Sequence, residues 1–183
     1  AKTRLQRTVT LIGMMGAGKT AVGRVLAAQL DADICDSDTQ IVENARLTIP
    51  EIFNRFGEPF FRDQETHVIA DLLGGAPCIL SVGGGAWLTP QNQAMMRAKS
   101  MVIWLNVDLN TLWQRVCDKD TRPLLQTENP KQTLADLYAT RTPIYALAPH
   151  RLDVAADWSV DDTAAHVLAL MTRAGAVRDD DGS

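Results

Sequence analysis

The segment that most constrains the fold is Gly13 to Thr20, which reads GMMGAGKT and fits the pattern G-x-x-x-x-G-K-[ST]. It follows a short apolar run, Val9 to Ile12, and it opens a helical pattern, Lys19 to Leu30. Glycines let such a loop curl so that backbone N–H groups point inward at a helix N-terminus, where they bind phosphate. The sequence therefore predicts a strand, a phosphate-binding loop and a helix in that order.

Each residue of this loop is a candidate nucleotide ligand, namely Gly13, Met14, Met15, Gly16, Ala17, Gly18, Lys19 and Thr20. Lys19 would bring a positive charge to the β- and γ-phosphates, and Thr20 would offer its hydroxyl to Mg²⁺. An alternative stays open, because Gly16-x-Gly18-x-x-Ala21 also fits the looser dinucleotide fingerprint. The Lys-Thr pair favours the phosphate loop, since a nicotinamide site or a bare turn does not need it.

Alternating strand and helix patterns continue along the chain. Four more strands are predicted at Ala32 to Cys35, Cys78 to Val82, Met101 to Val107 and Leu152 to Ala155. Helical patterns lie between and after them, at about 48–57, 59–73, 131–141 and 161–173, with further helix starts at Thr89 and Asp108. We therefore expect an α/β fold of three layers, a five-stranded parallel sheet flanked by helices, as one P-loop domain over 1–183. Ligands of such sheets bind at the C-terminal ends of the strands.

Composition narrows the classes of partner. The net charge is −4 and the pI is about 5.3, which argues against a nucleic-acid surface. No apolar run approaches the roughly 18 residues of a membrane span. Three scattered cysteines indicate a reducing cytoplasm. We expect a monomer whose polar segment 118–131 is a lid and whose tail, about 175–183, is frayed.

An acidic pair follows the second predicted strand. Asp36 would join the Mg²⁺ shell, and Asp38 would contact a substrate hydroxyl and accept its proton. One of the two could instead cap the helix that begins near Thr39, and both roles could hold at once.

Three glycines, Gly83, Gly84 and Gly85, close the third predicted strand. Their N–H groups could bind a carboxylate, a hydroxyl or the transferring phosphoryl group, or the glycines could form only a flexible turn.

Four arginines stand near these motifs, namely Arg62, Arg115, Arg122 and Arg141. Guanidinium groups bind carboxylates and phosphates through paired hydrogen bonds, so a grouped set suits an anionic substrate. A lone arginine is more often a surface residue, and Arg62 with Glu65 could be an ordinary helix pair.

The motifs together resemble the shikimate kinase family of P-loop proteins, over about Thr10 to Ala156. The phosphate loop, D-x-D, F-x-x-x-G-E-x-x-F-R at Phe53 to Arg62 and the triple glycine occur in the family's order. Arg122-Pro123-Leu124-Leu125 and Arg141-Thr142-Pro143-Ile144-Tyr145 follow them.

The resemblance implies transfer of the ATP γ-phosphoryl group to the 3-hydroxyl of shikimate, a step of chorismate and aromatic amino acid biosynthesis. It places the substrate region at about 36–66. Catalysis would fall to Asp38, Lys19 and Arg122, with Thr20 and Asp36 on the Mg²⁺ side. Substrate contacts would come from Asp38, Arg62, Glu65, Phe53, Phe61, Gly83, Gly84, Gly85 and Arg141. Arg122 would close onto the phosphates and Arg115 would stack on adenine, whereas the loop after Ala155 offers no basic adenine contact.

Three other functions stay in view. A related kinase of gluconate or a nucleotide would share the phosphate loop, but the triple glycine with Arg62 and Arg141 favours a small carboxylate. A nucleotide-binding module without catalysis does not need the acidic pair and the lid arginine. An oxidoreductase would bind nicotinamide.

Overall fold

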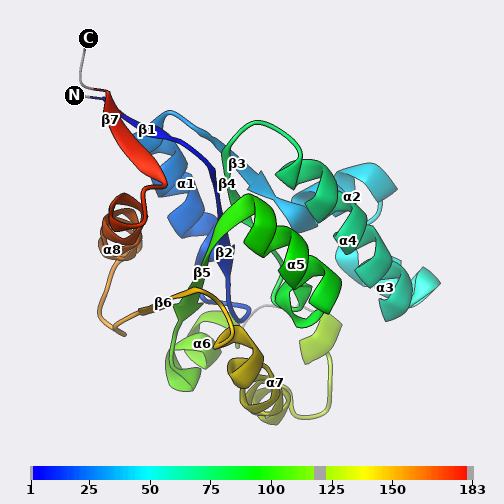
Figure 1. Ribbon diagram of the computed structural model, residues 1–183. Coiled ribbons are helices and arrows are strands. Elements are labelled where there is room, and N and C mark those ends of the chain that lie inside the picture. The colour runs from blue at the N-terminus through cyan, green and yellow to red at the C-terminus, as the bar shows by residue number, and fades with distance from the viewer. Residues whose placement is uncertain (1, 118–122, 181–183) are drawn as a thin grey trace.

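The computed structural model describes residues 2–117 and 123–180. At its centre is a parallel sheet of five strands in the order β3-β4-β2-β5-β6 (Figure 1). These strands are β2 (Thr8–Ile12), β3 (Asp33–Asp36), β4 (Cys78–Ser81), β5 (Ser100–Asn106) and β6 (His150–Asp153). The expected five-stranded parallel sheet is confirmed, and each strand lies within two residues of its predicted start.

Helices cover the sheet on both faces, as a parallel sheet requires (Figure 1). Helix α1 (Lys19–Leu30) packs against α8 (Val160–Arg173), and α5 (Pro90–Lys99) packs against β5 and against α4 (Glu58–Leu73). The remaining helices are α2 (Ser37–Ala45), α3 (Ile49–Phe56), α6 (Leu109–Val116), α7 (Pro130–Tyr145) and the short turns η1 (Ala86–Leu88) and η2 (Pro123–Leu125). Within the described ranges, no helix is long and apolar enough to cross a membrane.

Several helix starts follow the predicted capping chemistry. Thr48 and Glu51 form a capping box at α3, because the Thr48 hydroxyl accepts from the Glu51 N–H at 3.3 Å and Glu51 Oε1 accepts from the Thr48 N–H at 3.3 Å. Asp108 caps α6 by accepting from the Thr111 N–H at 3.0 Å. These ends depend on neighbouring residues alone, so sequence patterns predict them well.

Helix α7 runs past its predicted end at Arg141 and through Pro143. Proline lacks the N–H of a helical hydrogen bond and usually ends a helix. Here the turn beyond Pro143 is held from outside, because Trp87 Nε1 donates to the carbonyl of Ile144 at 2.9 Å. This contact between distant segments cannot be read from local pattern.

The frayed tail expected at 175–183 is not seen in its described part. Strand β7 (Val177–Asp180) pairs antiparallel with β1 (Lys2–Leu5), so the two ends of the chain meet (Figure 1). Gly175 turns the chain with φ +74°, Ala176 is fully buried, and the Thr3 hydroxyl donates to Asp179 Oδ1 at 2.7 Å. The strand escaped sequence reasoning because its partner lies at the opposite end of the chain.

Candidate active site

The phosphate loop lies between β2 and α1, as predicted. Gly16 and Gly18 have φ of +83° and +92°, a conformation that other residues rarely adopt. The Lys19 ammonium donates to the carbonyl oxygens of Gly13 at 2.6 Å and Met14 at 3.1 Å, so it lies directly over the loop. The loop therefore presents a positive charge beside the N-terminus of α1, the arrangement that binds phosphate.

Oxygen ligands for a divalent cation gather at the first turn of α1. The Thr20 hydroxyl donates to Asp36 Oδ2 at 2.7 Å and lies 3.1 Å from the Ser81 hydroxyl. Asp36 Oδ1 also accepts from the Thr39 N–H at 3.1 Å, so Asp36 caps α2 as well. Hydroxyl and carboxylate oxygens suit Mg²⁺, which keeps several of its waters, so the residues present fit this ion.

A cleft of about 590 Å³ opens along the phosphate loop. Beyond the loop its walls include Arg115 of α6, Trp158 after β6 and Thr163 of α8. Arg115 Nη1 donates to the carbonyl of Gly16 at 2.9 Å, so this arginine also braces the loop. The Trp158 ring stacks on the His166 ring, with centroids 3.8 Å apart and planes 16° apart. The cleft thus joins a phosphate site to an aromatic surface.

A second, smaller cavity of about 120 Å³ adjoins this cleft. Its walls come from the phosphate loop, α2, α3, α4, the triple glycine, η2 and α7. Phe53 and Phe61 form one side, with ring centroids 4.9 Å apart. Arg62 and Arg141 also line it, as does Leu124. The cavity combines an apolar wall with two cations, so it suits a small organic anion.

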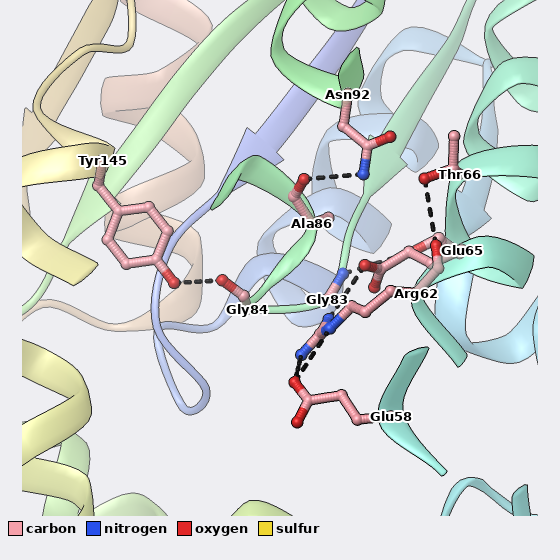
Figure 2. Close-up of polar contacts among 10 residues, drawn as sticks. Glu58, Arg62, Glu65, Thr66, Gly83, Gly84, Ala86, Asn92 and Tyr145 are labelled. Atoms are coloured by element: carbon pink, nitrogen blue, oxygen red, sulfur yellow. Dashed lines mark hydrogen bonds and ion pairs between the residues drawn. The ribbon is translucent and has the colours of Figure 1, made fainter. Parts of the chain in front are cut away.

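Arg62 is held by two carboxylates of its own helix (Figure 2). Its Nη1 donates to Glu65 Oε1 at 3.0 Å, and its Nη2 lies 3.3 Å from Glu58 Oε1. Glu65 is fully buried, and burial raises its pKa to about 7, although the Arg62 charge works against that rise. Its Oε2 atom has no hydrogen-bond partner within 2–117 and 123–180. The predicted Arg62–Glu65 pair is therefore a buried part of the cavity and not a solvated surface pair.

The triple glycine allows charged side chains to approach the backbone closely. A Cβ on Gly85 would overlap the Arg62 guanidinium, and one on Gly83 would lie 2.9 Å from Asp38 Oδ1. The Gly83 N–H also donates to the Ser37 hydroxyl at 3.3 Å. A side chain at Gly83 or Gly85 would therefore displace a charged group of the cavity, so these glycines keep Asp38 and Arg62 close to the backbone.

The two cavities share one wall, made of Met15, Asp38, Gly83 and Gly84. A phosphate bound by the loop and an anion bound by the arginines would therefore face each other across Asp38. All the predicted site residues that the structure describes line at least one of the two cavities, except Gly13 and Met14, which carry the carbonyls bound by Lys19. Arg122 lies outside the described residues.

Sequence reasoning overlooked three residues of the site. Ser81 gives no pattern, because a single serine at a strand end is common. Trp158 follows β6, and its place beside the phosphate loop depends on β6 lying next to β5 in the sheet. Tyr145, fully buried, donates its hydroxyl proton to the carbonyl of Gly84 (Figure 2). Trp87, which the sequence left without a role, is also fully buried in the core.

The fold and the two adjoining cavities define a P-loop kinase for a small-molecule acceptor. Residues 15–172 match the family profile described as Shikimate kinase, so the chain belongs to the shikimate kinase family. A shikimate kinase of Ruegeria pomeroyi is 49% identical over 167 residues, covering 91% of this chain and 86% of that protein. A shikimate kinase of Cereibacter sphaeroides is 48% identical over 179 residues, covering 97% and 89%.

Solved structures agree with this assignment. Shikimate kinase from Acinetobacter baumannii in complex with shikimate has a TM-score of 0.88 and 36% sequence identity, covering 92% of this chain and 94% of that chain. A gluconokinase from Sinorhizobium meliloti 1021 has a TM-score of 0.60 at 15% identity, covering 93% and 94%, which shows a shared fold alone. The family assignment decides against the nicotinamide alternative.

Proposed function

We propose that this enzyme transfers the γ-phosphoryl group of ATP to the 3-hydroxyl of shikimate, giving shikimate 3-phosphate and ADP. The observation that carries the proposal is the wall shared by the nucleotide cleft and the arginine-lined cavity, with Asp38 in it. Shikimate is a small hydroxylated acid, which matches a cavity of about 120 Å³ lined by Arg62 and Arg141. The two arginines would bind its carboxylate, and Asp38 would face its hydroxyls.

Phosphoryl transfer at this wall requires little covalent chemistry from the protein itself. The acceptor oxygen forms a bond to the γ-phosphorus as the bond to the bridging oxygen of ADP breaks, and the hydroxyl proton passes to Asp38. Lys19 and the loop N–H groups would stabilise the negative charge on the phosphoryl oxygens. Catalysis would then rest on position and charge.

Mg²⁺ fits the oxygen atoms of Thr20 and Asp36, which lie 2.7 Å apart. When bound, the ion would neutralise charge on the β- and γ-phosphates. For adenine we propose Arg115 and Trp158, which both line the cleft. Closure of the lid with Arg122, a monomeric state and a cytoplasmic location stay predictions.

The test is ADP release from Mg-ATP in a coupled assay, with shikimate, with gluconate and with no acceptor. We expect release that depends on shikimate, together with a product heavier than shikimate by one phosphoryl group. Release that responds only to gluconate would keep the kinase and overturn the acceptor. ATP binding without release on any acceptor would indicate a nucleotide-binding module.

A further inference from the structure

The smaller cavity, lined by Arg62 and Arg141, is called the acceptor cavity below. Its two arginines are held in place in different ways. Arg62 is paired with Glu58 and Glu65, as described above. Arg141 is only 4% exposed, yet its Nη1 atom has no hydrogen-bond partner in the described part of the chain. The guanidinium also forms a side-chain hydrogen bond with the Tyr145 hydroxyl, which opposes the effect of burial on the pKa of that tyrosine. The position of Arg141 is therefore set by Tyr145 and by the helix that carries both residues.

That helix, α7, is fastened to the glycine segment by two buried side chains. Tyr145 donates from its hydroxyl to the carbonyl of Gly84, and Trp87 of η1 donates from Nε1 to the carbonyl of Ile144 at 2.9 Å (Figure 2 shows the first). Both side chains are fully buried. Burial also raises the pKa of Tyr145 to about 12, so its hydroxyl stays a proton donor near neutral pH. The two hydrogen bonds run in opposite directions, one from α7 and one to it.

Arg141 lies on the face of α7 that Tyr145 occupies, because residues four apart lie one above the other on a helix. Both reach Gly84, since Arg141 Nη1 is 3.1 Å from the position that a Cβ on Gly84 would take. A shift of α7 against the glycine segment would therefore move Arg141 relative to the cavity.

The Tyr145 hydrogen bond also orients the peptide between Gly84 and Gly85. No peptide bond among the described residues is cis, so the carbonyl of Gly84 and the N–H of Gly85 point in opposite directions. With the carbonyl bound by Tyr145, the Gly85 N–H is turned away from α7. One hydrogen bond thus fixes both an arginine and a backbone donor of the cavity.

We propose that Tyr145 and Trp87 are positioning residues that hold Arg141 and the Gly84–Gly85 peptide in register for the acceptor's carboxylate. The inference rests on the proposed function, because it takes the acid acceptor to bind Arg141. Loss of the Tyr145 hydroxyl leaves a partly buried carbonyl unpaired and frees α7 to shift, which would weaken acceptor binding more than ATP binding.

The test compares Tyr145→Phe with Tyr138→Phe, a matched change on α7 at a partly buried tyrosine. We expect the KM for shikimate to rise about 10-fold in Y145F and to stay within about two-fold in Y138F, with the KM for ATP unchanged in both. Trp87→Phe should shift the KM for shikimate in the same direction, which keeps the test open if Y145F folds poorly.

A second readout does not need turnover. In ¹⁵N NMR spectra of the arginine side chains, the Arg141 Nε–H signal is identified by its loss in R141K. This Nε–H should exchange with solvent faster in Y145F than in the wild type. Equal exchange and equal KM values in Y145F and Y138F would overturn the inference. If the wild type does not phosphorylate shikimate but the Arg141 Nε–H still exchanges faster in Y145F, the proposed acceptor is wrong and the positioning role stands.

Discussion

The nucleotide cleft and the acceptor cavity meet at Asp38, but they are built differently. The phosphate part of the cleft comes from one continuous segment, whose backbone N–H groups and single lysine would bind the phosphates. The acceptor cavity takes residues from seven segments, which are spread from the phosphate loop to α7. A continuous backbone site can be recognised from a motif, whereas a cavity of distant side chains exists only after the sheet and its helices have assembled.

The two regions also differ in electrostatics. The Lys19 ammonium donates to two carbonyls of the phosphate loop. The acceptor cavity instead holds one buried carboxyl oxygen, Glu65 Oε2, and one buried guanidinium nitrogen, Arg141 Nη1, that lack hydrogen-bond partners in the described ranges. We infer that ligand binding adds little to the hydrogen bonding of the lysine in the cleft. In the acceptor cavity, a bound ligand would give hydrogen-bond partners to polar atoms that lack them.

The largest effect is expected from Lys19→Met in the cleft. Loss of the ammonium removes charge stabilisation of the transferring group, so kcat should fall about 10²- to 10³-fold. Shikimate affinity, measured by calorimetry, should stay within about two-fold of the wild type, because Lys19 does not line the smaller cavity. An equal loss of shikimate affinity would show that the two regions are not separate.

The reciprocal change is Arg141→Met in the acceptor cavity. Removing a buried charge that pairs with a substrate carboxylate costs about 2–5 kcal/mol, so the KM for shikimate should rise about 10²-fold or more. The matched control is Arg173→Met, since Arg173 is exposed at the end of α8 and lines neither cavity. A rise of the same size in the KM for ATP would contradict the separation of the nucleotide cleft from the acceptor cavity.

Trp158→Ala addresses the aromatic part of the cleft. Base stacking on an aromatic ring contributes about 1–3 kcal/mol, so the KM for ATP should rise about 10-fold while the KM for shikimate does not change. Phe56→Ala removes an aromatic ring that is 53% exposed and lines neither cavity, and it should leave both constants unchanged. An unchanged KM for ATP in W158A would place the base elsewhere.

The smallest effect concerns Glu65 and pH. Its pKa rises on folding from 4.5 to about 7, so between those values the folded state binds more protons than the unfolded chain. Stability from this group is therefore present at low pH and is lost as pH rises through about 7. The Tm of the wild type minus that of Glu65→Gln should fall by roughly 3 °C between pH 5 and pH 8. A constant difference would mean that Glu65 titrates normally.

The sequence predicted the parts of the site that depend on neighbouring residues. The phosphate loop, the Thr48 capping box and the carboxylates at the end of β3 follow from local geometry. Arg62 and Arg141 were predicted as site residues from their grouping with the other motifs and from the family resemblance. Their spacing in the sequence does not show that α4 and α7 line one cavity. Tyr145 and the β1–β7 pair needed the assembled fold, since each acts on a segment far away in the chain.

The most direct test of the account is phosphoryl transfer by Asp38→Asn, measured with γ-labelled ATP and shikimate. Asp38 lies where the cleft and the cavity meet, so its carboxylate should be needed for transfer and not for holding ATP. We expect transfer to fall about 10²-fold or more while the Kd for ATP stays within about two-fold. Transfer at the wild-type rate would contradict the account.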